Sequence, residues 1–330
     1  MTHRSRAAYT LTELLVVITI MAGLMGLVVA NSRPSRGTSD DIRRGARQLA
    51  SLLLNSQSQS LGSRPGAAVI IQSGGFSGET MSHARRYPFI EGRVNSGMPP
   101  TDPRVTQVTV NLTTTNDSAD SLVHGYRIRF FDRGADTQGP LSDWFSFSCL
   151  AAPTAVVRQR TENGQTAQTT LWPTVAVGGT LAFQAERYPI PIGVAEILPK
   201  GVVVDLRNSG YGDPTVAGWG SLANRGAIAI GFDSIGSMDT LMQNVLPADG
   251  SSRTVQPLYP AEEVYLFVTC RRDVEDPAVN ALSNPDALWV VIHPKSGRVT
   301  ISANVPQQNS DVTALRAARS NARQGITIGG

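Results

Sequence analysis

The sequence has little of the residue chemistry on which enzymes and metal sites depend. It carries two cysteines and four histidines among 330 residues, and none of them has the CxxC or Cys/His spacing of a zinc site. It lacks a GxSxG nucleophile motif, a glycine-rich phosphate loop and an HExxH metalloprotease motif. We therefore expect no catalytic residues, no bound metal and no cofactor.

The few remaining polar candidates are scattered along the chain. Two pairs of acids, Asp117 with Asp120 and Asp132 with Asp136, could contribute to a calcium site, but neither pair has EF-hand spacing. We interpret both pairs as solvated loop acids. The four histidines are scattered: His3 would leave with the first eight residues if these are cleaved, and His293, in a hairpin loop beside Pro294, is interpreted as a surface residue. The histidines are His3, His83, His124 and His293.

A surplus of one charge is also missing. The chain has 29 basic and 26 acidic residues, a net charge of +3 at pH 7. Two of the basic residues, Arg4 and Arg6, lie in the first eight positions, so the remainder has 27 basic and 26 acidic residues. Bulk charge therefore favours no particular polyanionic partner.

The two cysteines, Cys149 and Cys270, leave two interpretations open. If the chain folds outside the cytoplasm, they could form one disulfide across the 120 residues between them. Two buried thiols in separate strands explain the same pattern equally well.

What the sequence does have is a long apolar run near its start. Between residues 14 and 30 the only polar side chain is Thr19. As a helix these residues would cover ~26 Å, close to the ~30 Å hydrocarbon core of a bilayer. Arg4 and Arg6 precede the run and predict a cytoplasmic start with the rest of the chain outside. We expect one span over about 11–30, with the inner (cytoplasmic) membrane as location and its lipid bilayer as a partner.

Glu13 lies at the beginning of this apolar run. An ionised side chain at membrane depth costs at least ~2.5 kcal/mol, so an acid there is a hypothesis of function by default. The alternative is a carboxylate close enough to the interface to reach water.

The segment 8–18, AYTLTELLVVI, resembles the N-terminal signature of type IV pilins and type II secretion pseudopilins. In that family a prepilin peptidase removes a short basic leader, the new aromatic amino terminus is methylated, and a Glu follows at the fifth mature position. The resemblance implies that residues 1–8 are the leader, that cleavage falls between Ala8 and Tyr9, that Tyr9 is N-methylated and that Glu13 is the assembly carboxylate. Ala8 stands where the family usually has Gly, and Tyr9 where it usually has Phe.

The same resemblance implies partners. They are the prepilin peptidase and methyltransferase and other pilin or pseudopilin subunits. A buried carboxylate such as Glu13 could pair with the amino terminus of a neighbouring subunit and set the register of assembly, because a paired charge is tolerated where a lone one is not.

An ordinary secretory signal is the rival interpretation. The small-residue stretch 28–30 before Asn31 fits a signal-peptidase site. Glu13 argues against it, since a carboxylate in the apolar part of a signal peptide has no purpose there.

A second helical segment is predicted over 38–62, which with the span gives an N-terminal helix over 9–62. Pro34 and Gly37 break or kink the chain before it, and Gly62 is a plausible C-cap. Its apolar residues recur at helical spacing: Ile42, Ala46, Leu49, Ala50 and Leu53. The stretch 43–66 also resembles the arginine-rich helix of the GspH/FimT branch of minor pseudopilins.

From residue 63 to 330 we expect an exported β-rich domain, because β-branched residues are grouped in short runs. The stretches 74–103 and 161–170 are interpreted as insertions or loops, and hairpins are predicted at 175–183 and 288–301. The predicted fold class is α+β, a long N-terminal transmembrane helix followed by a mostly antiparallel, pilin-like β-domain. The predicted strands are 67–72, 105–112, 126–131, 144–150, 171–177, 180–186, 202–206, 227–232, 264–269, 288–292 and 299–302.

A short C-terminal helix is predicted over 311–324, capped by Asp311. Arg316, Arg319 and Arg323 then lie within about 60° of one another on its surface. A solvated helix face is one interpretation, and a stripe that contacts an anionic ligand such as DNA is the other.

These observations predict a structural pilin-like subunit, a minor pseudopilin of a type II secretion or type IV pilus-like assembly. The alternative is a membrane-anchored binding module that captures exported substrate proteins or DNA.

Overall fold

The computed structural model describes Met21 and residues 39–96, 105, 107–132, 142, 144–158, 161–162, 165–166, 172–173, 181–215, 220–223, 226–245, 254–258 and 260–325. The predictions for the leader, for Ala8 and Tyr9, for Glu13 and for the span 11–30 lie outside these residues, apart from Met21.

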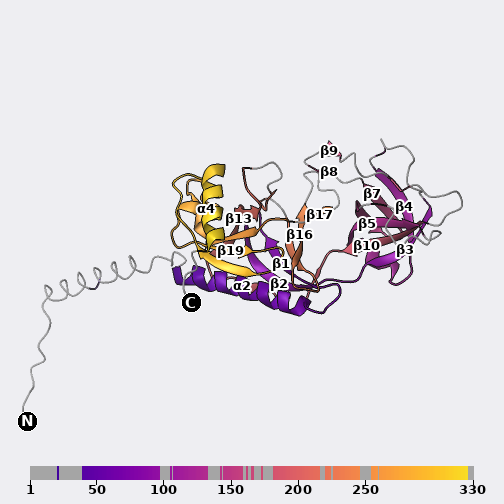
Figure 1. The fold of residues 1–330 in the computed structure, drawn as a ribbon, viewed down its shortest axis with the longest axis horizontal. Helices are drawn as coiled ribbons and strands as arrows, with labels where there is room; N and C mark the ends of the chain where they lie inside the picture. Colours follow the sequence, from indigo (N-terminus) through magenta and orange to yellow (C-terminus); the bar gives the residue numbers. More distant parts are fainter. Residues whose placement is uncertain are drawn as a thin grey trace, which may run out of the picture.

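A large antiparallel sheet forms one half of the described chain (Figure 1). Its main path runs β17-β16-β15-β1-β2-β13-β18-β19-β20, and β11, β12 and β14 pair at its sides. The bounds are β1 Ala67–Ser73, β2 Ser77–Arg85, β11 Ile190–Pro191, β12 Glu196–Ile197, β13 Val202–Tyr211, β14 Gly220–Ser221, β15 Ile228–Phe232, β16 Met238–Val245, β17 Thr254–Leu258, β18 Val264–Cys270, β19 Leu288–Ile292 and β20 Val299–Ala303. A separate two-stranded sheet joins β8 Thr161–Glu162 to β9 Gln165–Thr166.

Helix α2, Ser39–Ser60, lies along one face of this sheet (Figure 1). It falls inside the range 38–62 in which the sequence predicts an amphipathic helix. Its apolar stripe, which includes Ile42, Leu49 and Leu53, is fully buried in one core with side chains from β1, β13, β18 and β19. Burial of this stripe, rather than helix propensity, accounts for most of the stability of such a helix.

The turn between α2 and β1 depends on Gly66. Its backbone has φ +95°, and a Cβ there would collide with the carbonyl oxygen of Phe232. Only glycine tolerates both the left-handed conformation and this close approach. The turn therefore places β1 directly after α2 and against β15.

The opposite face of the sheet is covered by helix α4, Val312–Gln324, together with α3, Arg271–Glu275, and η2, Ala281–Ser283. Alternate residues of one strand serve the two faces: Leu266 packs toward α2, whereas Phe267 packs in the α4 core. This explains why every residue of β18 and β19 is buried.

A closed six-stranded barrel forms the other half of the described chain, at the far end from the beginning of α2 (Figure 1). It is inserted between β2 and β11 and has its own core, in which Phe145 stacks on Trp172 at 4.7 Å between ring centroids. The strand order is β10-β3-β4-β7-β6-β5, closing back on β10. The bounds are β3 Ile90–Ser96, β4 Gln107–Thr114, η1 Ala119–His124, β5 Gly125–Asp132, β6 Phe145–Ala151, β7 Thr154–Arg158 and β10 Leu181–Arg187.

The predicted fold class is wrong. The described chain is mainly β, with a barrel beside a large sheet, and its longest helix is the 22-residue α2 that packs against that sheet. None of the helices in the described residues is both long and apolar enough to cross a membrane. That finding contradicts the predicted location as a single-pass protein of the inner membrane.

Several predicted strands correspond to observed ones, and one interpretation of a long loop is wrong. The hairpin predicted at 288–301 is β19 paired with β20. The stretch 74–103, interpreted as an insertion or loop, contains β2 and β3. These strands carry few apolar residues. Their extended conformation is stabilised by hydrogen bonds to neighbouring strands of the sheet and of the barrel. The hairpin predicted at 175–183 lies mostly outside the described residues.

Candidate functional site

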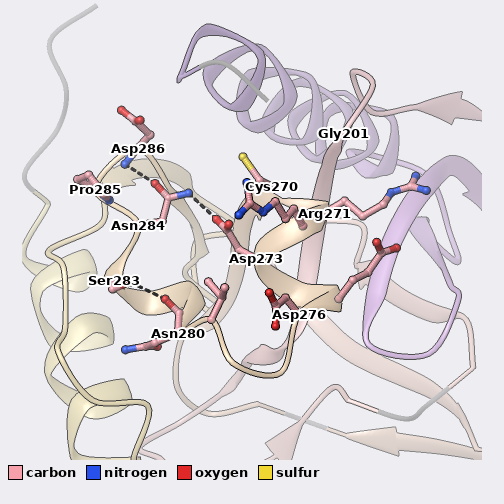
Figure 2. A pocket seen from close by; sticks show the side chains of 13 residues that line it. Gly201, Cys270, Arg271, Asp273, Asp276, Asn280, Ser283, Asn284, Pro285 and Asp286 are labelled. Carbon is pink, nitrogen blue, oxygen red and sulfur yellow. Dashed lines mark hydrogen bonds between the residues drawn. The ribbon is translucent and has the colours of Figure 1, made fainter. Parts of the chain in front are cut away.

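A cavity with several carboxylates in its lining lies beside the first turns of α2 (Figure 2). Its volume is about 900 Å³. The floor and walls come from the end of β18 and from the segment that carries α3 and η2. The lining includes four carboxylates, those of Asp273, Glu275, Asp276 and Asp286.

Local polar contacts shape this segment. Asn280 caps η2, because its side-chain oxygen accepts a hydrogen bond from the Leu282 N–H at 3.1 Å. The carboxylate of Asp276 accepts from the Ala278 N–H at 2.9 Å and forms the turn after α3. The chain therefore doubles back just after β18 and leaves the cavity between the two short helices.

Asp273 is the central carboxylate of the cavity. It accepts a hydrogen bond from the side-chain amide of Asn284 at 2.7 Å (Figure 2). It also accepts one from the hydroxyl of Thr269 at 3.2 Å. Two arginines, Arg271 and Arg272, also line the cavity, and Arg271 forms an ion pair with Glu79. Four carboxylates against two guanidinium groups leave the lining with an excess of negative charge.

Cys270 contributes a thiol to the same cavity. Burial raises the pKa of this thiol to about 11, and the charges of Asp273 and Asp286 add to the effect. The thiol is therefore protonated at neutral pH and is a poor nucleophile.

A smaller cavity of about 300 Å³ adjoins this one and shares Asp273 and Asn280 with it. Asp205 lines it and is 1% exposed. Burial raises the pKa of Asp205, whereas hydrogen bonds from the Asn208 amide at 2.6 Å and the Arg207 N–H at 2.9 Å lower it. Its acceptor oxygens are thus used to order the bend within β13.

The side chains that line the acidic cavities determine which groups these cavities could bind. In the part of the chain that the structure describes, no group of three or more His, Cys, Asp or Glu side chains is placed to hold a metal ion. The carboxylates of Asp273 and Asp276 accept hydrogen bonds within the segment, and the Cys270 thiol is protonated. What the site can do chemically is attract positive charge.

The three arginines predicted to form one stripe on the C-terminal helix have different environments and do not face solvent together. Arg319 is 2% exposed and donates to the backbone oxygens of Asn208 and Gly212 at 2.8 and 3.2 Å. Burial lowers its pKa to about 10, which still leaves it charged at neutral pH. Arg316 and Arg323 form ion pairs with acids in the loops next to β13 and β18, at 2.9 Å to Asp213 and 3.1 Å to Glu263.

These contacts correct the ligand hypothesis for α4. The predicted cap is confirmed, because the Asp311 carboxylate accepts from the Ala314 N–H at 2.7 Å. A guanidinium buried as Arg319 is cannot reach a phosphate in solution, so Arg316, Arg319 and Arg323 do not form a shared contact surface for DNA.

A second polar cluster lies where the barrel meets the sheet. Arg86 forms two hydrogen bonds with Asp239, at 2.7 and 2.8 Å, and an ion pair with Glu186 at 3.2 Å. Glu186 also pairs with Arg127, whose guanidinium lies 4.2 Å from the centre of the Trp144 ring. Burial lowers the pKa of Arg86, but the carboxylates of Asp239 and Glu186 outweigh it and the pKa is raised.

The positive charges of two arginines and the negative charges of two carboxylates are equal in number in this cluster. Each of the four groups contacts a group of opposite charge. Burial and the charge of Glu186 raise the pKa of Tyr126, which lies beside the cluster, well above its ordinary value. The ion pairs of this cluster link residues of the barrel to Arg86 and to Asp239 of β16.

The other predicted candidates are separated by the fold. Cys149 is buried in the barrel core and Cys270 at the edge of the α2 core, and no disulfide joins them. Asp117 was predicted to be a solvated loop acid, but it forms an ion pair with Arg187 at 2.8 Å. His83 lies 2.7 Å from the Ser56 hydroxyl, beneath α2.

Sequence reasoning missed both polar clusters. The acids of the α3 cavity are spread over 273–286 without a motif, and Arg86, Glu186 and Asp239 are more than 50 residues apart in pairs. One signal was available: Asn280 and Asn284 with Asp276 and Asp286 are a concentration of turn-forming residues.

Comparison with known proteins identified no similar sequence or structure. The chain matches no protein-family model, no curated protein and no solved structure.

Proposed function

We propose that this chain is a structural, pilin-like subunit, a minor pseudopilin of a type II secretion or type IV pilus-like assembly. The observation that carries the proposal is the register of leader, aromatic residue, carboxylate and apolar run in residues 4–30. Each of these parts alone is common, but their fixed spacing around Tyr9 and Glu13 is specific.

Features of the described chain support the same role. Helix α2 begins at Ser39, nine residues after the apolar run, and is held firmly along the sheet by a fully buried stripe. This packing fixes the orientation of α2 relative to the β-rich body.

The experiment that tests the proposal is mass spectrometry of the mature amino terminus, on protein recovered from the cells that make it. We expect a chain that begins with N-methyl-Tyr9. Replacement of Ala8 by a bulky residue, Ala8→Leu, should block cleavage, whereas the conservative Ala8→Gly variant should be processed at least as well.

Two results would contradict the proposal. A mature chain that begins at Asn31 would identify an ordinary secretory signal, and an intact Met1 would show that prepilin processing does not occur. Either result would remove the basis for assembly through Glu13.

A further inference from the structure

The outer surface of the barrel carries an arginine in an unusual environment. The neighbours of Arg129 in β5, Ile128 and Phe130, lie in the barrel core. Because side chains alternate along a strand, Arg129 points to the outside of the barrel, where it is half-buried. Its surroundings therefore form part of the molecular surface.

Three aromatic rings lie around this guanidinium. Its central carbon is 4.7 Å from the centre of the Trp144 ring, 5.1 Å from that of Phe131 and 5.6 Å from that of Phe89. All three distances are within the ~6 Å range of cation–π attraction. The rings of Phe89 and Trp144 also contact each other, with centres 5.6 Å apart. Each ring is half-buried, so part of its apolar surface faces solvent.

A line of polar side chains crosses the same surface. Gln184 of β10 lies opposite Arg129 of β5 on one side and opposite Glu91 of β3 on the other. Its side-chain oxygen accepts from Arg129 at 2.8 and 3.2 Å, and its amide nitrogen donates to the Glu91 carboxylate at 2.8 Å. Neighbouring strands are ~4.8 Å apart, so the line holds a donor and an acceptor ~10 Å from each other.

The charges at the two ends of this line are not neutralised by direct partners. Within the described part of the chain, neither Arg129 nor Glu91 forms an ion pair. Burial and the like charge of Arg127 lower the pKa of Arg129, and the charge of Glu186 does not outweigh them. Ionisable groups in such unfavourable positions occur often at functional sites. The donors of Arg129 and the exposed carboxylate of Glu91 are therefore available to a ligand.

The chemistry of these groups matches a sugar. A pyranose ring has a flat face of C–H groups that stacks on an aromatic ring, and its hydroxyl groups both donate and accept hydrogen bonds. Arginine is a pure donor and an ionised carboxylate a pure acceptor, so together they satisfy both functions of a hydroxyl group. We call the surface the barrel platform; it consists of Phe89, Glu91, Arg129, Phe131, Trp144 and Gln184.

Single-stranded nucleic acid also stacks on aromatic side chains, but it requires a positively charged groove along its backbone. The barrel platform has a carboxylate, Glu91, on its own surface. The neighbouring arginine Arg127 is paired with Glu186, which removes its charge as a contact for phosphate. The charge pattern therefore favours a neutral ligand over a polyanion.

We propose that the barrel platform binds a neutral polysaccharide, with sugar rings on the aromatic side chains and hydroxyl groups bound by Arg129 and Glu91. The ~10 Å between these two groups fits a short stretch of sugar units better than a single ring. The proposal goes beyond the proposed function and does not depend on processing at Tyr9.

Isothermal titration calorimetry of the full-length chain with neutral hexasaccharides tests the proposal. The probes are cellohexaose, mannohexaose and chitohexaose. We expect saturable binding of at least one of them, with an affinity that is the same at ~50 and ~200 mM salt, since a polyanion would lose affinity steeply over this range. Oligothymidylate is the comparison ligand and should not bind to the platform.

Two variants and a matched control locate the site. Arg129→Gln and Trp144→Ala should each weaken binding by about tenfold or more, the effect of one lost hydrogen bond to a charged group or one lost stacking surface. Arg158→Gln is the control and should bind as the wild type does. Arg158 of β7 also donates to a glutamine, Gln107, at 3.3 Å, but no aromatic ring of the described residues lies over it.

A variant at an exposed position guards against misfolding. Glu91→Gln replaces an exposed carboxylate, so we expect unchanged thermal unfolding together with binding weakened by about tenfold. Absence of binding to every hexasaccharide, binding of oligothymidylate at the platform, or equal binding by Arg129→Gln and Arg158→Gln would overturn the proposal. The mature amino terminus is measured separately, so failure of sugar binding and failure of the proposed function are distinguishable.

Discussion

Single residues decide whether the barrel stays fixed to the sheet. Glu186 is 4% exposed and contacts both Arg86 and Arg127. Buried arginines without a partner cost far more than exposed ones, because the protein interior does not replace the lost hydration.

The first prediction concerns this carboxylate. Glu186→Gln leaves two buried guanidinium groups with less negative charge and should lower the free energy of unfolding by about 3–5 kcal/mol. Chemical denaturation followed by circular dichroism measures the change. Arg316→Ala, which removes an exposed ion pair, is the control and should cost about 0–1 kcal/mol.

Cys270 gives a second prediction at this scale. Its pKa is about 11 in the folded chain against 9.0 for an ordinary thiol. Between pH 9 and 11 the unfolded chain loses this proton while the folded chain keeps it, so the thiol makes the unfolding free energy fall as pH rises through that window. Comparison of the wild type with Cys270→Ala over this range isolates the effect. Identical slopes for the two proteins would contradict the raised pKa.

At the scale of elements, α2 has a buried side and an exposed side whose substitutions should differ sharply. Leu49→Ala opens a cavity in the core that α2 shares with the sheet and should cost about 2–5 kcal/mol of stability. Leu54→Ala removes an exposed side chain and should cost less than about 0.5 kcal/mol. Thermal unfolding of both variants measures the difference, and similar losses would mean that α2 is not seated as described.

The sequence predicts an element well when the residues that specify it lie within that element, and poorly when they lie far away in the chain. The ranges of α2 and α4 follow from apolar spacing and from a capping acid, and β19 follows from a continuous apolar run. Strands β2 and β3 are polar and owe their conformation to partners far away in the chain, so no local pattern reveals them. The spacing of arginines on α4 predicts a stripe but not which side of the helix faces the sheet, and so it misses the burial of Arg319.

The acidic cavity and the barrel junction were not predicted from the sequence. The junction arises from contacts between distant residues, such as Arg86 with Asp239. The cavity combines local turns with the contact of Asn284 with Asp273, and no motif marks that combination. The N-terminal motif is the opposite case, since all its parts lie within one short segment. Its interpretation is a proposal that processing experiments must decide.

At the scale of the whole molecule, the barrel and the sheet have separate cores that meet in a small apolar cluster around Tyr126 and Ala84. We predict that the wild type unfolds in one calorimetric transition, because the buried ion cluster couples the halves. In Glu186→Gln the coupling weakens, and two transitions should separate. A single sharp transition in that variant would show that the apolar cluster alone suffices.

The way the chain enters and leaves the barrel has a practical consequence. The two passages run side by side as an antiparallel ribbon, with Arg85 opposite Ile190 and Ile90 opposite Ala185. The barrel is therefore connected to the sheet through two adjacent antiparallel segments. A foreign domain whose two ends lie close together could therefore replace residues 90–185. This junction is a suitable site for attaching another domain to the sheet.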